Sequence, residues 1–302
     1  MSESQVWFIT GAGSNFGVTL IRAALAAGHR VVATARKLSS LSLESSDSLL
    51  LVELDVTQQT HIDAAFEAAI ARFGHIDVVV NKAGTSLLGE VEAVPEEDAR
   101  HFFEVQFWGP VAVSKAALKV FRETKPAGAR RCIINVSSAT AALAPPLHAF
   151  HAASKAALET LTLSLNRELP KEWNIRAFNV EIGGFESKPA LVRVLPQPPA
   201  YAAAAPGIVS MFRTNIATNG PPPGIGDVNK MARSMLDLAR PDAGKLPVLI
   251  TLGSDAWMLA RTVQQRGLEE LQGEEARARS TDRDGTDPAV VEQMVGHISM
   301  LL

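Results

Sequence analysis

The sequence has little cysteine and tyrosine, no long apolar run and no excess of basic residues. Its one cysteine, Cys132, lies in an apolar segment, so the chain offers neither an internal disulfide nor a cysteine-based metal site. A formal net charge of -3 argues against nucleic acid as a partner, because such binding usually needs a basic field. No apolar run reaches the roughly 18 residues that span a membrane.

The amino-terminal residues contain no basic segment followed by an apolar one, so they do not resemble a secretory signal. We therefore expect a cytoplasmic protein that has no membrane span and binds no metal. Of the 302 residues, 47% are hydrophobic and 20% are charged, which suffices for one large core.

Apolar runs of strand length alternate with longer segments of helical period, as is typical of a parallel sheet with helices on both faces. The sequence therefore predicts an α/β fold of the doubly wound (Rossmann) type with a parallel seven-stranded sheet. Thr57 and Thr60 are predicted to cap the second helix. The predicted strands are residues 6–10, 30–34, 50–54, 76–81, 132–136, 175–180 and 248–252.

Composition divides the chain into a Rossmann domain, residues 1–257, and a helical extension, residues 258–302. Within the domain, residues 188–227 contain two stretches rich in proline and glycine that cannot hold a regular element for long. This insertion is interpreted either as a substrate lid or as a tolerated surface loop. The extension begins with a charged helix, typical of a solvated face, and ends in a short apolar tail that suits a docking helix.

The first predicted strand runs into TGAGSNFG, residues 10–17, and then into a helix. In such a unit, backbone amides at the positive end of the helix can bind a pyrophosphate. Asn15 stands where close approach favours glycine, and asparagine tolerates left-handed geometry better than most residues. The segment predicts a dinucleotide-binding turn that tolerates Asn15 at some cost in affinity.

The second predicted strand ends in ATAR, residues 33–36, and has no acidic side chain to accept hydrogen bonds from an adenosine ribose. Arg36 would instead suit a 2′-phosphate. The pattern favours NADP(H) over NAD(H), unless Arg36 is an ordinary surface charge.

Taken together, these segments resemble the short-chain dehydrogenase/reductase family from about residue 6 to residue 257. The resemblance rests on TGAGSNFG at 10–17, TAR at 34–36, LDV at 54–56, NKAG at 81–84, NVSS at 135–138, HxxxK at 151–155 and VEIGGFES at 180–187. It implies that Asp55 and Val56 hold the adenine. It implies a cofactor-binding set of Gly11, Ser14, Asn15, Gly17, Arg36, Asp55, Val56, Asn81, Ala83, Gly84, Lys155, Ile182 and Ser187.

The resemblance also assigns the catalytic positions to Ser138, His151, Lys155 and Gln106. Two of them depart from the family, since Gln106 falls at the tetrad asparagine and His151 at the tetrad tyrosine. Ser138 precedes His151 by thirteen residues, the usual separation in the family. The one tyrosine of the chain, Tyr201, lies in the insertion without a matching context.

Three further positions depart from the family pattern on the cofactor side. Asn15 replaces a glycine, Lys82 replaces the second asparagine of the NNAG motif, and Ile182 stands where proline is usual. Lys82 is interpreted either as a contact to a cofactor phosphate or as an outward-pointing side chain.

His151 and Lys155 are four residues apart on one predicted helix and share a face. Ketone reduction needs a hydride from the nicotinamide and a proton for the forming alkoxide. The pKa of an ordinary histidine lies near 6.5, and a neighbouring ammonium lowers it, so His151 is expected to be a neutral imidazole near pH 7.

Three hypotheses follow for the role of His151. In the first, the protein is a reductase, and the imidazolium or a water relayed from Lys155 donates the proton. In the second, it is a non-redox isomerase, dehydratase or cyclase, in which His151 moves a proton while Ser138 and Lys155 polarise a carbonyl. In the third, it is a catalytically inactive binding protein. The presence of both Ser138 and Lys155 favours the first.

Apolar side chains in the insertion predict a pocket wall and a lipophilic carbonyl substrate of the secondary-metabolite kind. An insertion that packs on a neighbouring subunit is the alternative, and the resemblance implies a homodimer or homotetramer. His148 is interpreted either as a substrate contact or as a surface histidine. The apolar residues of the insertion are Leu191, Val192, Val194, Leu195, Tyr201, Ile208, Met211 and Phe212.

Overall fold

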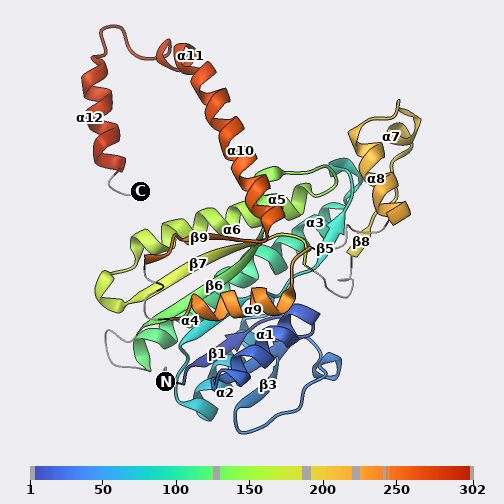
Figure 1. The fold of residues 1–302 in the computed structure, drawn as a ribbon, viewed down its shortest axis with the longest axis vertical. Coiled ribbons are helices and arrows are strands. Elements are labelled where there is room, and N and C mark those ends of the chain that lie inside the picture. Colours follow the sequence, from blue (N-terminus) through green and yellow to red (C-terminus); the bar gives the residue numbers. More distant parts are fainter. Residues whose placement is uncertain are drawn as a thin grey trace. The chain divides into compact units, whose positions relative to one another are not determined.

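The computed structural model describes residues 4–124, 130–185, 192–219, 225–240, 243 and 245–299. The chain divides into two compact units, Met1–Trp257 and Met258–Leu302. The first unit is built on a seven-stranded parallel sheet (Figure 1). In sheet order, the strands are β3 (Leu49–Glu53), β2 (Arg30–Ala35), β1 (Val6–Ile9), β4 (Val78–Asn81), β6 (Arg131–Ser138), β7 (Ile175–Ile182) and β9 (Leu249–Leu252).

The strand order reverses beside β1. From β1 the chain builds β2 and β3 on one side and then returns to place β4 on the other side. Both neighbours pair with β1 in parallel, so that Trp7 lies opposite Val31 and Val78. Such a reversal leaves a crevice at the carboxyl ends of the central strands, where doubly wound folds bind ligands. The predicted fold is confirmed, and it gathers the residues that follow β1, β2, β4 and β6 at one edge.

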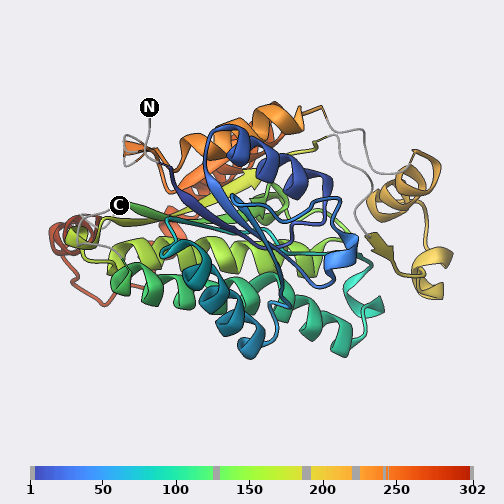
Figure 2. The ribbon, with the colours of Figure 1, turned by 90° about the horizontal axis from the view of Figure 1, so that it is seen from below.

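Alternate residues of the sheet supply two cores, because successive side chains of a strand point to opposite faces. Trp7 and Ile9 belong to the core beneath α1 and α9, whereas Val6 and Phe8 belong to the core beneath α2 and α4. Figure 2 shows α1 and α9 on one face and α2, α4 and α6 on the other. These helices are α1 (Asn15–Ala26), α2 (Gln59–Phe73), α4 (Gly109–Glu123), α6 (Ala149–Glu168) and α9 (Val228–Asp237).

The first two helices begin in different ways. The side chain of Ser14 caps α1 by accepting a hydrogen bond from a first-turn amide at 3.0 Å. For α2 the predicted caps Thr57 and Thr60 are wrong, because its N-cap is Gln58, whose side chain makes no capping bond. The hydroxyl of Thr57 instead donates to Asp55 Oδ1 at 2.8 Å, an alternative that short polar side chains readily form.

Two features of the strands differ from the sequence prediction. Strand β6 continues to Ser138 because β7 pairs with it along its whole length, with Ser138 opposite Ile182. A second parallel sheet joins β5 (Ser86–Leu88) to β8 (Val192–Val194). Each of these strands has three residues, which is too short for apolar alternation to identify.

The described part of the insertion contains β8, α7 (Pro199–Ala203) and α8 (Ile208–Asn219). Arg213 of α8 attaches it to the loop after β5. Its Nε donates to Glu90 Oε1 at 2.8 Å, Nη2 also bonds this carboxylate, and Nη1 donates to the carbonyl oxygen of Leu195 at 3.0 Å. Glu90 is buried, and the hydrogen bonds from Arg213 lower the pKa of its carboxyl.

The second unit holds most of α10 (Ser254–Gly273) together with α11 (Glu275–Arg279) and α12 (Pro288–Ser299). Charged side chains of α10 pair along their own helix, as Arg266 does with Glu270 at 3.0 Å, which is typical of a solvated face. Of the helices that the structure describes, none combines the length and apolar character needed to cross a membrane.

Replacing Arg213 with alanine leaves the buried Glu90 carboxylate without its cation, a change that typically costs about 3–5 kcal/mol. We expect limited proteolysis within residues 192–219 to become at least about tenfold faster, because local opening becomes easier. Arg193→Ala is the matched control, since it removes the more exposed ion pair with Asp98 at 2.9 Å and should change the rate less than about twofold. Equal cleavage rates in the two variants would contradict the anchoring role of Arg213.

Candidate active site

The turn between β1 and α1 approaches neighbouring backbone closely at both of its predicted glycines. Gly11 has a φ of +68°, and a Cβ added there would lie 2.6 Å from the Cα of Ala83. A Cβ added at Gly17 would lie 2.7 Å from a carbonyl oxygen of the turn itself. Ser14 caps α1 and Asn15 is its first residue, so both lie at the positive end of the helix. The turn has the form of a phosphate-binding site.

The segment after β4 packs against this turn. The Thr10 hydroxyl accepts hydrogen bonds from the amides of Lys82 at 3.0 Å and Ala83 at 3.1 Å. The Lys82 ammonium donates to the carbonyl oxygen of Gly11 at 3.3 Å and to the hydroxyl of Ser14. Burial lowers the pKa of Lys82 to about 8. The Lys82 side chain therefore points toward the glycine turn, a direction that the amino-acid sequence alone did not specify.

Arg36 and Asp55 follow β2 and β3 at the same edge. Asp55 Oδ1 accepts hydrogen bonds from the amide of Thr57 at 3.0 Å and from its hydroxyl at 2.8 Å. Burial opposes ionisation of Asp55, but these hydrogen bonds and the charge of Arg36 together lower the pKa of its carboxyl. The side chain of Val56 is buried against α4, where a Cβ on Gly109 would lie 2.7 Å from it. The guanidinium of Arg36 and the carboxylate of Asp55 thus lie where the resemblance expects the adenosine of a cofactor to bind.

Hydrogen bonds within the core hold the side chain of Asn81. It is buried, and its Nδ2 donates to Asn135 Oδ1 at 2.8 Å and to the Ser114 hydroxyl at 3.1 Å. These bonds join β4, β6 and α4 beneath the carboxyl edge of the sheet. In the NKAG segment, residues 81–84, Ala83 and Gly84 reach the carboxyl edge of the sheet. Ala83 is partly buried and Gly84 is exposed.

Gln106 lies on a π-helical turn, η3 (Glu104–Trp108), between α3 (Glu96–Phe103) and α4. Such turns are frequent at functional sites. Gln106 Nε2 donates to the carbonyl oxygen of Thr85 at 2.6 Å, whereas the buried Oε1 has no hydrogen-bond partner among the described residues. A Cβ on Gly84 would lie 2.6 Å from this oxygen. Because an unsatisfied buried acceptor is costly, Oε1 is suited to a donor on a bound ligand.

Ser138 ends β6, and Lys155 bonds the same strand two residues earlier, at Val136. Ser138 is the last residue of the strand, and its Oγ accepts hydrogen bonds from the amide of Thr140 at 3.2 Å and from its hydroxyl at 3.0 Å. Lys155 of α6 is buried, and its ammonium donates to the carbonyl oxygen of Val136 at 2.9 Å. Burial lowers the pKa of Lys155 to about 8, with Glu159 opposing this change and Lys82 adding to it.

His151 lies one helical turn before Lys155. Its ring tilts against that of Phe102, with the centroids 6.0 Å apart, and its buried Nδ1 has no hydrogen-bond partner in the described part of the chain. Burial, followed by the charges of Lys155 and His148, lowers the pKa of His151 to about 3. Only about 0.1% of the imidazole is then protonated at pH 6.

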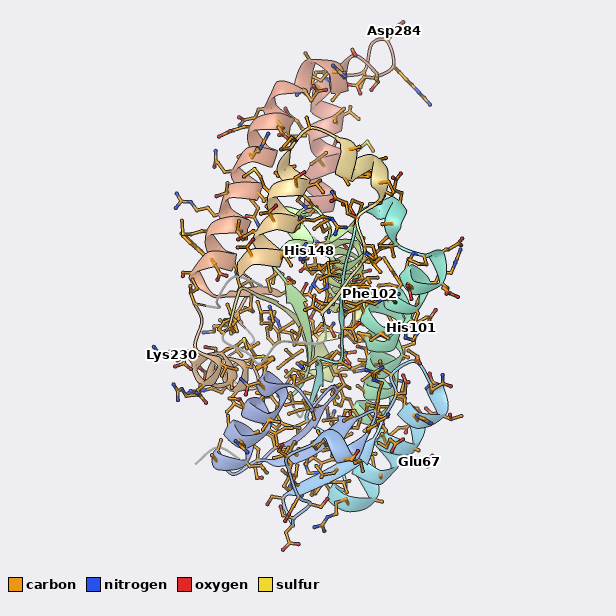
Figure 3. The ribbon with its side chains drawn as sticks, turned by 90° about the vertical axis from the view of Figure 1, so that its right-hand side faces the viewer. Glu67, His101, Phe102, His148, Lys230 and Asp284 are labelled. Carbon is orange, nitrogen blue, oxygen red and sulfur yellow. The ribbon has the colours of Figure 1, made fainter. Side chains whose placement is uncertain are left out.

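His148 precedes α6 and points its ring back into its own loop. Its Nδ1 donates to the carbonyl oxygen of Pro146 at 2.9 Å, since a carbonyl can only accept. Figure 3 looks onto this end of the molecule and labels His148 together with Phe102.

Sequence reasoning missed Glu159, which lies one turn beyond Lys155 on α6. The Ser137 hydroxyl donates to its carboxylate. Burial raises the pKa of Glu159 to about 7, with Glu181 adding to the rise and with Ser137 and Lys155 opposing it. The four-residue spacing from Lys155 was the available signal, because such positions share a helix face.

The neighbours of Glu159 form a polar row across the sheet. Ser137 on β6 stands opposite Glu181 on β7, which stands opposite Thr251 on β9. The Thr251 hydroxyl donates to Glu181 Oε2 at 3.0 Å. Burial raises the pKa of Glu181, as it does for Glu159. Titratable groups therefore continue from Lys155 through Glu159 to Glu181 on β7, and Thr251 on the edge strand β9 ends the polar row.

An apolar pocket of about 400 Å³ lies beside the start of α6. It is bounded by the loops after β5 and before α6 and by one side of α6 itself, and no charged side chain lines it. Pockets of this kind suit apolar ligands. Its lining residues are Gly89, Val91, Ala141, Ala144, Pro145, Pro146, Leu147, Ala149, Ala152, Ala153 and Ala156.

The apolar residues predicted to form a wall in the insertion are mostly placed elsewhere. Leu195 is buried in a small core that also contains Phe102, the residue in contact with His151. Ile208 and Met211 are 62% and 70% exposed, and Val192 and Val194 are exposed as well.

Two predicted residues remain to be placed. Ile182 is the last residue of β7, and its carbonyl oxygen accepts a hydrogen bond from the amide of Ala139 at 3.3 Å. Ser187 lies outside the described residues, as does Leu191 of the insertion. In the described part of the chain, no three histidine, cysteine or acidic residues gather as a metal site would require.

The lowered pKa of His151 makes folding sensitive to acid. Between about pH 6.5 and pH 3 the unfolded chain binds a proton at this position that the folded chain does not, so stability falls as the pH falls through this window. His151→Phe keeps the ring and removes the titration. We expect its melting temperature to fall less than that of the wild type between about pH 7 and pH 4. His101→Phe, at an exposed position, should follow the wild type. If the melting temperatures of wild type and His151→Phe depended on pH in the same way, the lowered pKa of His151 would be refuted.

Comparisons with known proteins agree with this architecture. The family model described as short chain dehydrogenase matches residues 5–193. An uncharacterized oxidoreductase of Schizosaccharomyces pombe is 33% identical over 286 residues, which cover 95% of this chain and 94% of that protein. The oxidoreductase calM of Penicillium decumbens is 33% identical over 278 residues, which cover 90% of this chain and 91% of that protein.

A solved structure shows the same similarity in three dimensions. A short-chain dehydrogenase from Streptomyces avermitilis superposes with a TM-score of 0.80 at 30% identity, covering 93% of this chain and 100% of that one. The family model matches more than half of the sequence, and the fold agrees with it. The chain therefore belongs to the short-chain dehydrogenase family, a family of oxidoreductase enzymes.

Proposed function

We propose that the protein is an NADP(H)-dependent oxidoreductase that reduces a carbonyl group of an apolar substrate. The observation that carries this proposal is that Lys155 of α6 donates a hydrogen bond to the carbonyl oxygen of Val136 on β6, the strand that ends at Ser138, while His151 lies one turn before Lys155. The apolar pocket of about 400 Å³ beside α6 supports a substrate without charge.

The residues at this edge fit a nicotinamide dinucleotide. Gly11 and Gly17 leave no room for a Cβ against neighbouring backbone, so the turn packs tightly at the amino-terminal end of α1, where backbone amides can bind a phosphate. Arg36 is exposed directly after β2, where a guanidinium favours a 2′-phosphate over a 2′-hydroxyl. When bound, the nicotinamide supplies the hydride. The chain's own residues must then bind the carbonyl oxygen and provide the proton.

The titration behaviour of the two α6 residues separates their roles. His151, with a pKa of about 3, is too rarely protonated to serve as an imidazolium donor, and it is also a weak base. Because the non-redox hypothesis needs His151 to accept a proton, its weak basicity counts against that hypothesis. As a neutral imidazole, His151 donates one N–H hydrogen bond, which together with the Ser138 hydroxyl stabilises negative charge on the carbonyl oxygen.

Lys155 is the proton source in this scheme. Its ammonium is buried at the end of β6, and its pKa of about 8 leaves it mostly protonated near neutral pH but ready to release the proton. A water molecule relays the proton from Lys155 to the alkoxide, which is the second route that the sequence left open.

The pH dependence of reduction distinguishes Lys155 from His151 as the donor. At saturating NADPH, which removes the effect of Lys82 on cofactor binding, we expect kcat/KM for reduction of an apolar ketone not to rise as the pH falls below about 7 and to fall about tenfold per pH unit above about pH 8, as Lys155 loses its proton. Lys155→Met should lower kcat by at least about 100-fold. A rate that instead rises steadily toward acidic pH would identify the imidazolium as the donor and contradict this assignment.

The role of Arg36 is tested by binding. We expect nucleotide-free protein to bind NADPH more tightly than NADH, and Arg36→Ala to weaken NADPH binding about 10- to 100-fold while changing NADH binding less than about twofold. Arg22→Ala, at an exposed position of α1, is the control and should change neither. Failure of the wild-type protein to bind either nucleotide in a calorimetric titration would eliminate hydride transfer.

A further inference from the structure

The Lys82 ammonium carries a positive charge that the surrounding protein does not neutralise. Its two hydrogen-bond acceptors, the carbonyl oxygen of Gly11 and the hydroxyl of Ser14, are both uncharged. Within the described residues no carboxylate pairs with it, and burial is the cause of its lowered pKa. Lys82 is partly buried, and an ammonium whose acceptors are all uncharged favours an anion at this position.

The surroundings of Lys82 add to this positive potential. The glycine turn at residues 11–17 contains no ionisable side chain, and the first turn of α1 contains no acidic residue. The amino-terminal end of α1 adds the positive end of its dipole. On α6, the ammonium of Lys155 lies close enough for Lys82 to lower its pKa, and Glu159 lies one turn farther along. Arg36 and Asp55 lie after β2 and β3, and neither contributes to the pKa shift of Lys82.

We propose that Lys82 binds the diphosphate group of the dinucleotide and so takes part in setting the affinity for the cofactor. This inference rests on the proposed NADP(H)-dependent function. The resemblance places a neutral asparagine at this position. The ammonium of Lys82 supplies from the β4 side a charge-assisted contact that amides of the turn alone do not provide.

Lys82 and Arg36 then recognise different phosphates. The diphosphate is common to NADH and NADPH, so Lys82 strengthens the binding of both cofactors and does not distinguish between them. Arg36 acts only on the 2′-phosphate. The two contributions are separable with fragments, since ADP-ribose carries the diphosphate without a 2′-phosphate, and adenosine 2′-monophosphate carries the 2′-phosphate without a diphosphate.

The experiment is a calorimetric titration of both fragments, and of NADPH, into wild type, Lys82→Asn, Lys82→Arg and Arg36→Ala. We expect Lys82→Asn to weaken the binding of ADP-ribose about 10- to 100-fold and the binding of adenosine 2′-monophosphate less than about twofold. Arg36→Ala should show the reverse pattern. Lys82→Arg, which keeps a cation, should retain most of the ADP-ribose affinity. Melting curves of the free variants verify that each is folded.

A second readout follows from the protonation state of Lys82. Only the ammonium form attracts the diphosphate, and this diphosphate does not titrate near neutral pH. For a pKa of about 8 in the free protein, ADP-ribose affinity should fall about tenfold between pH 7 and pH 9. Binding near pH 8 should take up protons, visible as a dependence of the measured heat on the buffer. Both effects should be absent in Lys82→Asn.

The outcomes separate this inference from the proposed function. If wild type binds NADPH but Lys82→Asn binds ADP-ribose equally well or more tightly, Lys82 has no binding role, or it obstructs the turn, and the inference is overturned while the proposed function stands. If wild type binds neither NADPH nor ADP-ribose, the proposed function fails and the inference fails with it.

Discussion

The concentration of positive charge at the carboxyl edge of one sheet is the constraint on which the site depends. Lys82 follows β4 and Lys155 reaches the end of β6, and burial lowers the pKa of each to about 8. The amino-terminal end of α1 lies at the same edge and has the same sign. A site with this potential favours anions, and it releases protons from lysine near physiological pH.

Burial, more than the neighbouring charges, decides the state of His151. The charges of Lys155, one turn away, and of His148 add to its effect and lower the pKa of the imidazole further. In that environment the histidine is a neutral hydrogen-bonding group that rarely carries a second proton to give to an alkoxide. The substitution at position 151 therefore changes the chemistry of the residue without changing the field that acts on it, and Lys155 becomes the remaining source of protons.

The sequence was sufficient for the fold because the strands are buried on both faces and read as continuous apolar runs. It also located the residues at the sheet edge, since motif order fixes which strand each one follows. It could not show that Asn81 lies in the core, that Lys82 faces the glycine turn, or that Glu159 acts on Lys155. These facts depend on side-chain direction and burial, which periodicity does not specify. The three-residue strands β5 and β8 were invisible for the same reason.

The buried amides beneath the edge explain how two like charges can be held there. Asn81 and Asn135 bond each other across β4 and β6 at 2.8 Å, and Asn135 Nδ2 donates to the hydroxyl of Thr162 on α6 at 2.9 Å. Breaking such a network leaves buried polar groups unsatisfied, so the strands and helix that carry Lys82 and Lys155 resist separation. Burial is the main cause of the lowered pKa of each lysine, and Lys82 adds a smaller repulsion at Lys155, so a bound anion would favour the charged forms without moving these strands.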